Sequence, residues 1–499
     1  MENIKEEYKK AVKYFLDNKL FIVAVILITV LSFGFTITNS SIGMDDTAFD
    51  VYYKNKEMLS IGRWGSYIIY QVLNISEFVP FWIDFIASSE IMLTAVLWCI
   101  FLKKNIGEKL SIGAYIAFAT AFISFPIINE IFIFENCNIA VMLGSFLASL
   151  GIMMFYENYI NVHKKRIYFV SILTLTFALS MYEACVQIML VAICITAIMI
   201  IYLNKDKKIK DIFKYLFGAL AVVTGAIILN TIIVKLIYLI GVEYSAAADK
   251  RVSWGRYNLI DSLVMIIYYI VDALKNIHNF SVVVFLAISV IGLFISVSQS
   301  DKKKNWMILL IFFAMFLSNF AISMIQLGYV YYRTCTSWSL YVAIIVMTFY
   351  KLLSNHKITK ILAGVAICIL VLQQSRMLNQ LFYNDYMRYQ KDLHIAYDLI
   401  YSLQENYDTT KPLVITGDIY RGMNKYASQS NSISVLWWGK KSFGVKGSEF
   451  VKFLNSLGYK FRIPTNEEVE KGKQEAENMS RYPQEGSIKE LEDCIVINF

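Results

Sequence analysis

The feature that most constrains this chain is a series of apolar runs, each about as long as a membrane is thick. A helix needs about 20 apolar residues to cross the hydrocarbon core of a bilayer, with about 17 to 25 tolerated. The runs lie at 20–38, 79–102, 110–128, 137–156, 166–181, 184–204, 212–241, 281–298, 306–325, 338–353 and 359–376. With 57% hydrophobic and only 17% charged residues, the chain exceeds what a water-soluble interior can hide. The sequence predicts an all-α polytopic membrane bundle of about eleven transmembrane helices.

Basic residues in the short loops predict the orientation of this bundle, because cytoplasmic loops carry an excess of Lys and Arg. Lysine-rich segments lie at 5–19, 103–109, 164–166, 205–210, 302–304 and 351–360. The opposite loops hold fewer cations and several carboxylates, among them Glu77 and Glu243. We therefore expect a multi-pass protein of the cell membrane with a cytoplasmic N-terminus and long outer loops at 39–78 and 242–280. The first of these loops has apolar residues at helical spacing, which predicts amphipathic helices at the membrane surface.

The composition turns polar after the last apolar run. The pieces KPLVITGD, GSEFVKFLNSLGYKF and DCIVINF alternate strand-like and helix-like patterns, which is typical of a small α/β domain. The sequence thus predicts a transmembrane domain over 1–382 and an extracytoplasmic α/β domain over 383–499. Within the latter, Trp437 and Trp438 are candidate stacking surfaces for sugar rings, although core packing is the commoner role of such a pair.

The first outer loop carries an acid pair, Asp45 and Asp46, directly after Gly43. Adjacent acids at the mouth of a helix bundle repel each other unless a cation or hydrogen-bond donors lie near. One of them could then act as a general base, removing the proton from an attacking hydroxyl. Standing alone, the pair would more commonly be a solvated turn. If a divalent cation such as Mg²⁺ or Mn²⁺ binds, the same two carboxylates are its expected ligands, but nothing in the sequence requires one.

Seventeen residues after the pair, the loop contains Gly62, Arg63 and Trp64. The planar fork of an Arg suits a phosphate or a carboxylate, and an indole suits a sugar face or the membrane interface. Without further context, this motif would be interpreted as an interfacial anchor.

Two segments of the chain resemble a known family. The segment GMDDTAFDVYYKNKEMLSIGRWGSYII resembles the first outer loop of Gtr-type membrane glucosyltransferases, which include phage-encoded serotype-converting O-antigen glucosyltransferases. The closing RYPQEGSIKELEDCIVINF is similar to a YP-x-x-GSI segment in relatives of that family. The similarity covers both ends of the chain and the general hydropathy, while the middle matches only in pattern.

The resemblance implies a GT-C-like fold with its active site on the extracytoplasmic face. Enzymes of this type take a sugar from a polyprenyl-phosphate donor and pass it to a surface glycan such as O-antigen or teichoic acid. An acid of the first outer loop lies at the catalytic centre, which in this chain means Asp45 and Asp46. The implied partners are the donor, the polysaccharide acceptor, membrane lipids, a polyprenyl-phosphate glycosyltransferase and a flippase. No nucleotide cofactor is expected, because the sugar arrives on a lipid.

Cations in other outer loops are candidates for stabilising the leaving phosphate, on which negative charge develops. Arg333 is the cation of the short loop GYVYYRTCTSW, and Lys250 and Arg251 lie in ADKRVSWGR. An Arg among tyrosines can also simply snorkel to the interface, and a solvated loop is the commoner role for the other two.

Three carboxylates lie near outer helix ends, where they are costly unless they are paired or face a wet cavity. They could orient an acceptor hydroxyl or pair with Arg333, and they are Glu130, Glu135 and Glu183. Glu183 also predicts a break in the apolar stretch 166–204, because two short helices turning there cost less than a carboxylate at the bilayer centre.

The first hypothesis is therefore an inverting glycosyltransferase that uses a polyprenyl-phosphate sugar, with glucose as the first sugar to test. The alternative is a lipid-linked sugar flippase or another transporter, although the later spans do not visibly repeat the earlier ones. A polymerase or ligase of O-antigen shares the outer site but more often uses large later loops. Nucleic acid is not an expected partner, because the cations behind the net charge of +8 lie in short clusters between apolar runs.

Overall fold

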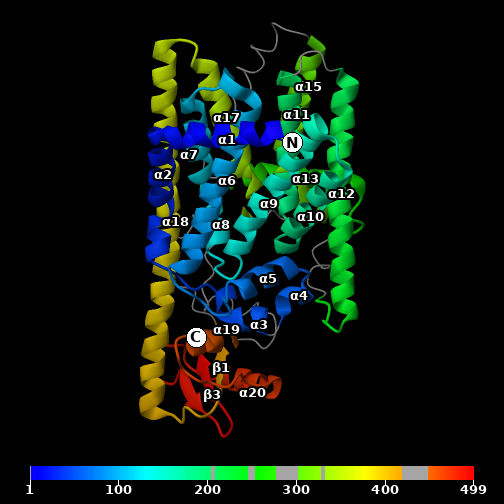
Figure 1. Ribbon diagram of the computed structural model, residues 1–499. Coiled ribbons are helices and arrows are strands. Elements are labelled where there is room, and N and C mark those ends of the chain that lie inside the picture. Colours follow the sequence, from blue (N-terminus) through cyan, green and yellow to red (C-terminus); the bar gives the residue numbers. More distant parts are fainter. Residues whose placement is uncertain are drawn as a thin grey trace.

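The computed structural model describes residues 2–54, 56–203, 208–245, 253–276, 302–327, 332–417 and 448–499. Within them, a bundle of long helices carries a small three-stranded domain at one end (Figure 1). The long helices of the bundle are α1 (Glu2–Asp17), α2 (Lys19–Thr38), α6 (Trp82–Ile106), α7 (Ile112–Ile123), α9 (Asn138–Glu157), α10 (Lys165–Met181), α11 (Cys185–Leu203), α12 (Ile209–Leu239), α13 (Leu259–Asn276), α15 (Lys302–Ser318), α17 (Ser337–Leu353) and α18 (Lys357–Asn406). The prediction of a helical membrane bundle with a small C-terminal α/β domain is confirmed.

Several of these helices have the length and apolarity of a membrane span. Seven stretches qualify among the described residues: Lys19–Thr38, Trp82–Lys109, Ile112–Phe132, Asn138–Val162, Cys185–Leu203, Ile209–Leu239 and Lys357–Asn406. Trp306–Ser318 and Ser337–Leu353 are shorter apolar helices. The span expected at 281–298 lies outside the described residues. Large apolar side chains on α2 and α12 remain exposed, for example Leu20 and Phe217, as expected for faces that contact lipid.

The break expected near Glu183 is confirmed, since α10 ends at Met181 and α11 begins at Cys185. The two helices pack closely on α9, where small residues let the backbones approach. A Cβ on Gly151 would lie 2.5 Å from the Leu175 side chain, and one on Gly144 would lie 2.9 Å from Cys185 Sγ. These contacts place the turn between α10 and α11 beside the start of α9.

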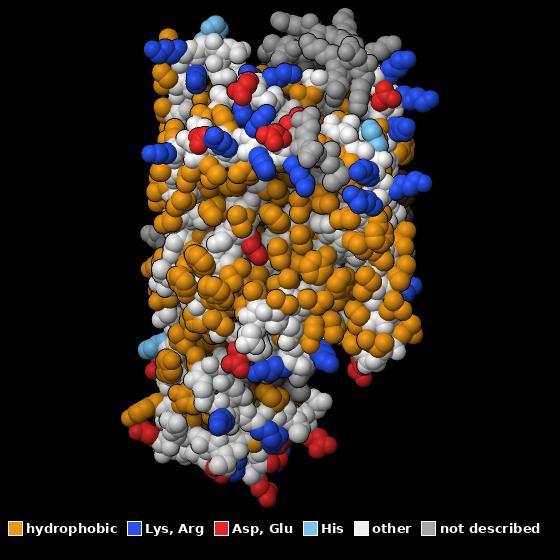
Figure 2. All heavy atoms as spheres, in the orientation of Figure 1, with side chains coloured by type: hydrophobic (Ala, Val, Ile, Leu, Met, Phe, Trp, Pro, Cys, Tyr) orange, Lys and Arg blue, Asp and Glu red, His pale blue; other side chains and the backbone are white. Residues whose placement is uncertain are grey.

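The two ends of the bundle differ in charge. Figure 2 shows Lys and Arg side chains gathered at the end that α1 crosses, above an apolar belt, with the C-terminal domain at the other end. The α1 helix is held there by a partly buried cluster, in which Lys104 Nζ lies 2.7 Å from Glu157 and 3.6 Å from the exposed Glu7. Tyr8 of α1 also donates a hydrogen bond of 3.0 Å to Glu157.

Short helices fill the opposite end, between the bundle and the C-terminal domain (Figure 1). The first loop forms η1 (Asp45–Ala48), α3 (Phe49–Tyr53), α4 (Glu57–Ser60) and α5 (Trp64–Val72). Tyr53 and Tyr70 from this loop are fully buried and stack at 4.5 Å. Their hydroxyls donate to the carbonyls of Asn136 and Glu135, respectively. The helices expected here thus exist, and these tyrosines anchor them to the bundle.

Further short elements connect the long helices. They are η2 (Gly107–Lys109), η3 (Pro126–Ile128), α8 (Asn129–Phe132), the π-helical η4 (Asn158–Val162), α16 (Ala321–Gln326) and η6 (Tyr332–Thr334). Of these, α8 packs on η6, so the segment before α9 lies beside the loop that carries Arg333.

The C-terminal domain contains β1 (Leu413–Thr416), α19 (Ser448–Ser456), α20 (Asn466–Ala476), β2 (Ile488–Glu490) and β3 (Ile495–Asn498). The sheet order is β1-β3-β2, with β1 and β3 parallel and β2 and β3 antiparallel. Trp437 and Trp438 lie outside the described residues. The boundary predicted at residue 383 falls inside α18, which continues without interruption from the bundle into the core of this domain.

Candidate active site

The acid loop is held in place mainly by backbone groups. Asp46 is 4% exposed, and its two oxygens accept hydrogen bonds from the Gly43 amide at 2.8 Å and from the Asn136 amide at 3.0 Å. The Asn136 side chain donates in turn to the Asp45 carbonyl at 3.2 Å. The loop that follows α2 is therefore joined to the segment that precedes α9.

The two acids of the pair have different surroundings. The Asp46 carboxyl is enclosed, and its burial raises its pKa to about 7, against the two amide hydrogen bonds, which lower it. The charges of Asp45 and Asp385 raise this pKa further. Asp45 is only partly buried. Asp46 thus shapes the loop, while Asp45 is the carboxylate that a ligand reaches more easily.

A second buried carboxylate pair adjoins the loop. Glu135 and Asp84 are 3% and 1% exposed, and the Asn138 amide donates to both, at 3.3 and 3.2 Å. Thr36 at the end of α2 donates to the other Asp84 oxygen at 2.8 Å. Burial raises the pKa of Glu135 well above its ordinary value, and the neighbouring charges of Asp84 and Asp46 add to this.

Glu135, one of the sequence candidates, is thus a buried carboxylate beside the acid loop, whereas Asp84 was not among those candidates. A signal was available for Asp84, because it is an ionisable residue inside the predicted span 79–102, and such residues are functional candidates.

Arg63 also belongs to the first loop and lies directly before α5. Its guanidinium lies 4.8 Å from the centre of the Tyr182 ring, and Nη2 lies 3.4 Å from Glu183. Arg63 Nε is buried and has no hydrogen-bond partner in the part of the chain that the structure describes. Glu183 is thus an ion-pair partner of Arg63, and a guanidinium nitrogen is left for a further acceptor.

Arg333 comes close to the same place from η6. Its guanidinium lies 4.8 Å from the centre of the Phe134 ring. Burial raises the pKa of the Cys137 thiol, Arg63 and Arg333 both lower it, and Asp45 and Asp46 both raise it. Burial also raises the pKa of the Tyr182 hydroxyl, and both Arg residues lower it. The segment before α9 therefore contacts Asp46 at Asn136 and Arg333 at Phe134, and Arg63 also acts on the neighbouring Cys137 thiol, although the first loop and η6 are far apart in the sequence.

The remaining sequence candidates have different positions. Trp64 donates its indole N–H to Asn230 at 2.9 Å and packs on Phe177, so it anchors α5 to α12 and α10. Glu130 is partly exposed on α8, which packs on η6. Its charge adds to burial in raising the pKa of the Cys335 thiol. Lys250 and Arg251 lie outside the described residues.

A third group of charges, which the sequence analysis missed, lies on α18. Arg388 makes hydrogen bonds of 3.0 to 3.1 Å with Asp385 and of 3.0 Å with Asp392, and all three residues are at most 3% exposed. Asp385 also accepts a hydrogen bond from the Ser41 hydroxyl. The spacing of i, i+3 and i+7 on one helix face was the available signal.

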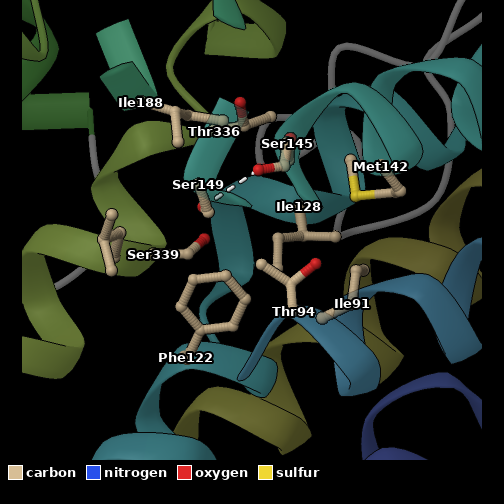
Figure 3. Close-up of a pocket in the computed structure, with 11 residues that line it drawn as sticks. Ile91, Thr94, Phe122, Ile128, Met142, Ser145, Ser149, Ile188, Thr336 and Ser339 are labelled. Carbon is tan, nitrogen blue, oxygen red and sulfur yellow. Dashed lines mark hydrogen bonds between the residues drawn. The ribbon is translucent and has the colours of Figure 1, made fainter. Parts of the chain in front are cut away.

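A small cavity of about 20 Å³ lies inside the bundle, and none of the charged residues above lines it. Figure 3 shows the hydroxyl side chains that line it together with apolar ones, namely Thr94, Ser145, Ser149, Thr336 and Ser339. This volume suffices for about one water. Among the described residues, no group of three or more His, Cys, Asp or Glu side chains is placed to hold a metal ion.

Comparison with known proteins gives one match. The family model described as glucosyl transferase GtrII matches residues 34–353, which is more than half of the chain. The match includes the acid loop, Arg63, Glu135 and Arg333, and it ends before α18. No match was found among curated proteins or among solved structures.

Proposed function

Because this chain belongs to the GtrII glucosyl transferase family and is thus a membrane glycosyltransferase, we propose that its donor is a polyprenyl-phosphate sugar. The sugar, for which glucose is the first candidate, passes with inversion to a cell-surface glycan. The observation that carries this proposal is that the segment before α9 contacts both Asp46, through the Asn136 amide, and Arg333, through the Phe134 ring, while Arg63 of the first loop stacks on Tyr182.

Such a site has the two kinds of group that the transfer needs. A carboxylate base activates the acceptor hydroxyl, and fixed cations stabilise the charge that develops on the leaving phosphate. The site lies at one end of an apolar bundle. A polyprenyl chain can therefore remain in the hydrocarbon while its phosphate and sugar reach the loop.

In the proposed reaction, Asp45 takes the proton from the acceptor hydroxyl as that oxygen bonds to the anomeric carbon. The bond between the anomeric carbon and the phosphate oxygen breaks, and its electron pair leaves with the polyprenyl phosphate. Arg63 and Arg333 stabilise this phosphate. Asp46 keeps the loop in shape through the two backbone amides. Asp45 is assigned as the base because it is the more accessible of the two acids.

We further propose that the loop end of the bundle faces away from the cytoplasm. Support comes from the Lys and Arg side chains at the opposite end (Figure 2), as the positive-inside rule requires. The donor would then be synthesised on the cytoplasmic face by another glycosyltransferase and moved across by a flippase. The acceptor would be an envelope polysaccharide, and the described part of the C-terminal domain would be placed to contact it.

The test is a transfer assay on purified protein with synthetic lipid-phosphate glucose and related sugars. Wild type is compared with Asp45→Asn and Asp46→Asn, and each assay is repeated with EDTA. Glu77→Gln is the matched control, since Glu77 is an acid of the same loop that is exposed and paired with Lys54. We expect Asp45→Asn to lower kcat by about 10²- to 10⁴-fold while donor binding persists, and Glu77→Gln to be active.

Two outcomes would contradict the proposal. Full activity of both Asn variants would make the acid pair a structural turn and move the search for a base to Glu135 or Asp84. Movement of lipid-linked sugar across a vesicle membrane, without any transfer by the wild type, would instead favour a flippase. Loss of activity with EDTA would show that transfer requires a divalent cation.

A further inference from the structure

The helix α18 connects the C-terminal domain to the acid loop, and none of its residues takes part in the proposed reaction. It has 50 residues, or about 75 Å at 1.5 Å per residue, and runs along one side of the molecule (Figure 1). Its second half contributes Ala396, Leu399 and Leu403 to the core of the C-terminal domain. Between the apolar bundle and this core lie the buried charges Asp385, Arg388 and Asp392.

These charges contact the two residues that precede the Gly43–Asp46 turn. Arg388 Nη1 donates to the Ile42 carbonyl at 3.0 Å, and Asp385 accepts from the Ser41 hydroxyl. On the other side of the turn, the Asn136 backbone amide donates to Asp46. The acid loop is therefore held on both sides, by α18 and by the segment before α9.

The C-terminal domain also packs directly on this loop. The α19 helix contacts η1, and Ile42 is 6% exposed within the same core as Phe450 and Leu399. The core of the C-terminal domain thus includes a residue that lies three positions before Asp45. The C-terminal domain therefore contacts the acid loop directly as well as through α18.

The contact between α18 and the acid loop is made by buried charged residues, although apolar residues could also join the two. Burying ion pairs costs desolvation, and well-packed apolar residues often stabilise a fold as well or better. Arg388 uses its planar fork toward Asp385 and still reaches a backbone carbonyl of the loop, a geometry that Lys cannot reproduce. The charges on α18 therefore orient the backbone of the acid loop at Ile42 in addition to joining the loop to the helix.

We propose that Arg388 is a positioning residue, which holds the Asp45–Asp46 loop in its reactive geometry through Ile42, Asp385 and Ser41 and so couples docking of the C-terminal domain to catalysis. This inference rests on the proposed function, in which Asp45 is the base. A reacting group that is misplaced by about 1 Å can lose about 10² in rate. Loosening this contact should then lower kcat more than it raises the KM for the donor.

The experiment compares Arg388→Lys, Ser41→Ala and the control Arg462→Lys with wild type. Arg462 is an exposed Arg of the C-terminal domain that pairs with Glu468 and does not enter the proposed mechanism. Each protein is studied by transfer kinetics and by hydrogen–deuterium exchange of peptides that cover residues 39–48. Ser41→Ala removes only one hydroxyl, so it provides a test if Arg388→Lys fails to fold.

We expect faster exchange in 39–48 and about a tenfold or greater loss of kcat in Arg388→Lys, with a smaller change of the same kind in Ser41→Ala. Arg462→Lys should match wild type in both measurements. The effects of the first two substitutions on kcat should be non-additive when combined, because they act through one contact.

Unchanged exchange in both variants would overturn the proposal, and so would faster exchange with unchanged kcat. If wild type transfers no sugar from any lipid-linked donor, the proposed function fails and the catalytic part of this inference fails with it. The exchange measurement still decides in that case whether Arg388 holds the loop.

Discussion

The raised pKa of Asp46 makes a specific prediction about stability. Folding takes this carboxyl from its ordinary pKa of 3.8 to about 7 because it is buried. Between these values the folded protein keeps a proton that the unfolded chain has released. Stability therefore falls as pH rises from about 4 to about 7 and is constant with respect to this group above that. At about 1.4 kcal/mol per pKa unit, the total loss is about 4 kcal/mol.

Asp46→Asn removes this titration and leaves the others in place. The Asn side chain has one oxygen for the two amides that donate to Asp46, so the variant loses one of these hydrogen bonds at every pH. The pH dependence of the difference between the two proteins is the diagnostic quantity. We expect the stability of wild type relative to Asp46→Asn to decrease by about 3 kcal/mol from pH 4.5 to pH 8, because part of the total change lies below pH 4.5.

The assay is thermal unfolding in detergent across this pH range, followed by circular dichroism. Glu77→Gln is the control of opposite sign, because its hydrogen bond and ion pair with Lys54 lower the pKa of Glu77. Its contribution is lost only as pH falls below about 4.5, so the difference between wild type and Glu77→Gln should be nearly constant over the assayed range and should decrease only below it. A difference between wild type and Asp46→Asn that is flat, or that grows with pH, would refute the inference that this carboxyl is enclosed.

Three further predictions follow from the geometry. Arg333→Ala should weaken donor binding and turnover in the transfer assay, with Arg333→Lys intermediate, since a guanidinium suits phosphate better than an ammonium does. Wild-type donor binding and turnover in both variants would make Arg333 an interfacial anchor. Cysteine introduced at position 77 should react with a membrane-impermeant maleimide in intact cells, whereas cysteine at 303 should not, and the reverse pattern would invert the proposed topology. Gly417→Ala should destabilise the C-terminal domain by at least about 1–2 kcal/mol in limited proteolysis, because this residue has φ +76 and its new Cβ would clash with the Phe499 carbonyl; wild-type resistance would contradict this.

The sequence by itself determined the membrane bundle, because each apolar run reports its own environment without reference to the rest of the chain. It also indicated strand-like pieces in KPLVITGD and DCIVINF, where the structure has β1 and β3, because their short apolar runs are equally local. The acid loop was found through adjacent residues and a short resemblance, and the family match confirms that resemblance. Each of these signals is contained in a single stretch of about 30 residues or fewer.

Only the tertiary structure decided which charges face one another. The Arg63–Glu183 pair spans 120 positions, and the contact from Arg388 to Ile42 spans 346. Such partners are chosen by how helices pack, and helix packing depends on side chains along whole surfaces that no local pattern records. The same reason explains why the predicted domain boundary at 383 falls inside a continuous helix. A helix can pass from lipid to water without a break when its exposed residues change from apolar to polar, because its backbone hydrogen bonds are satisfied internally in both environments.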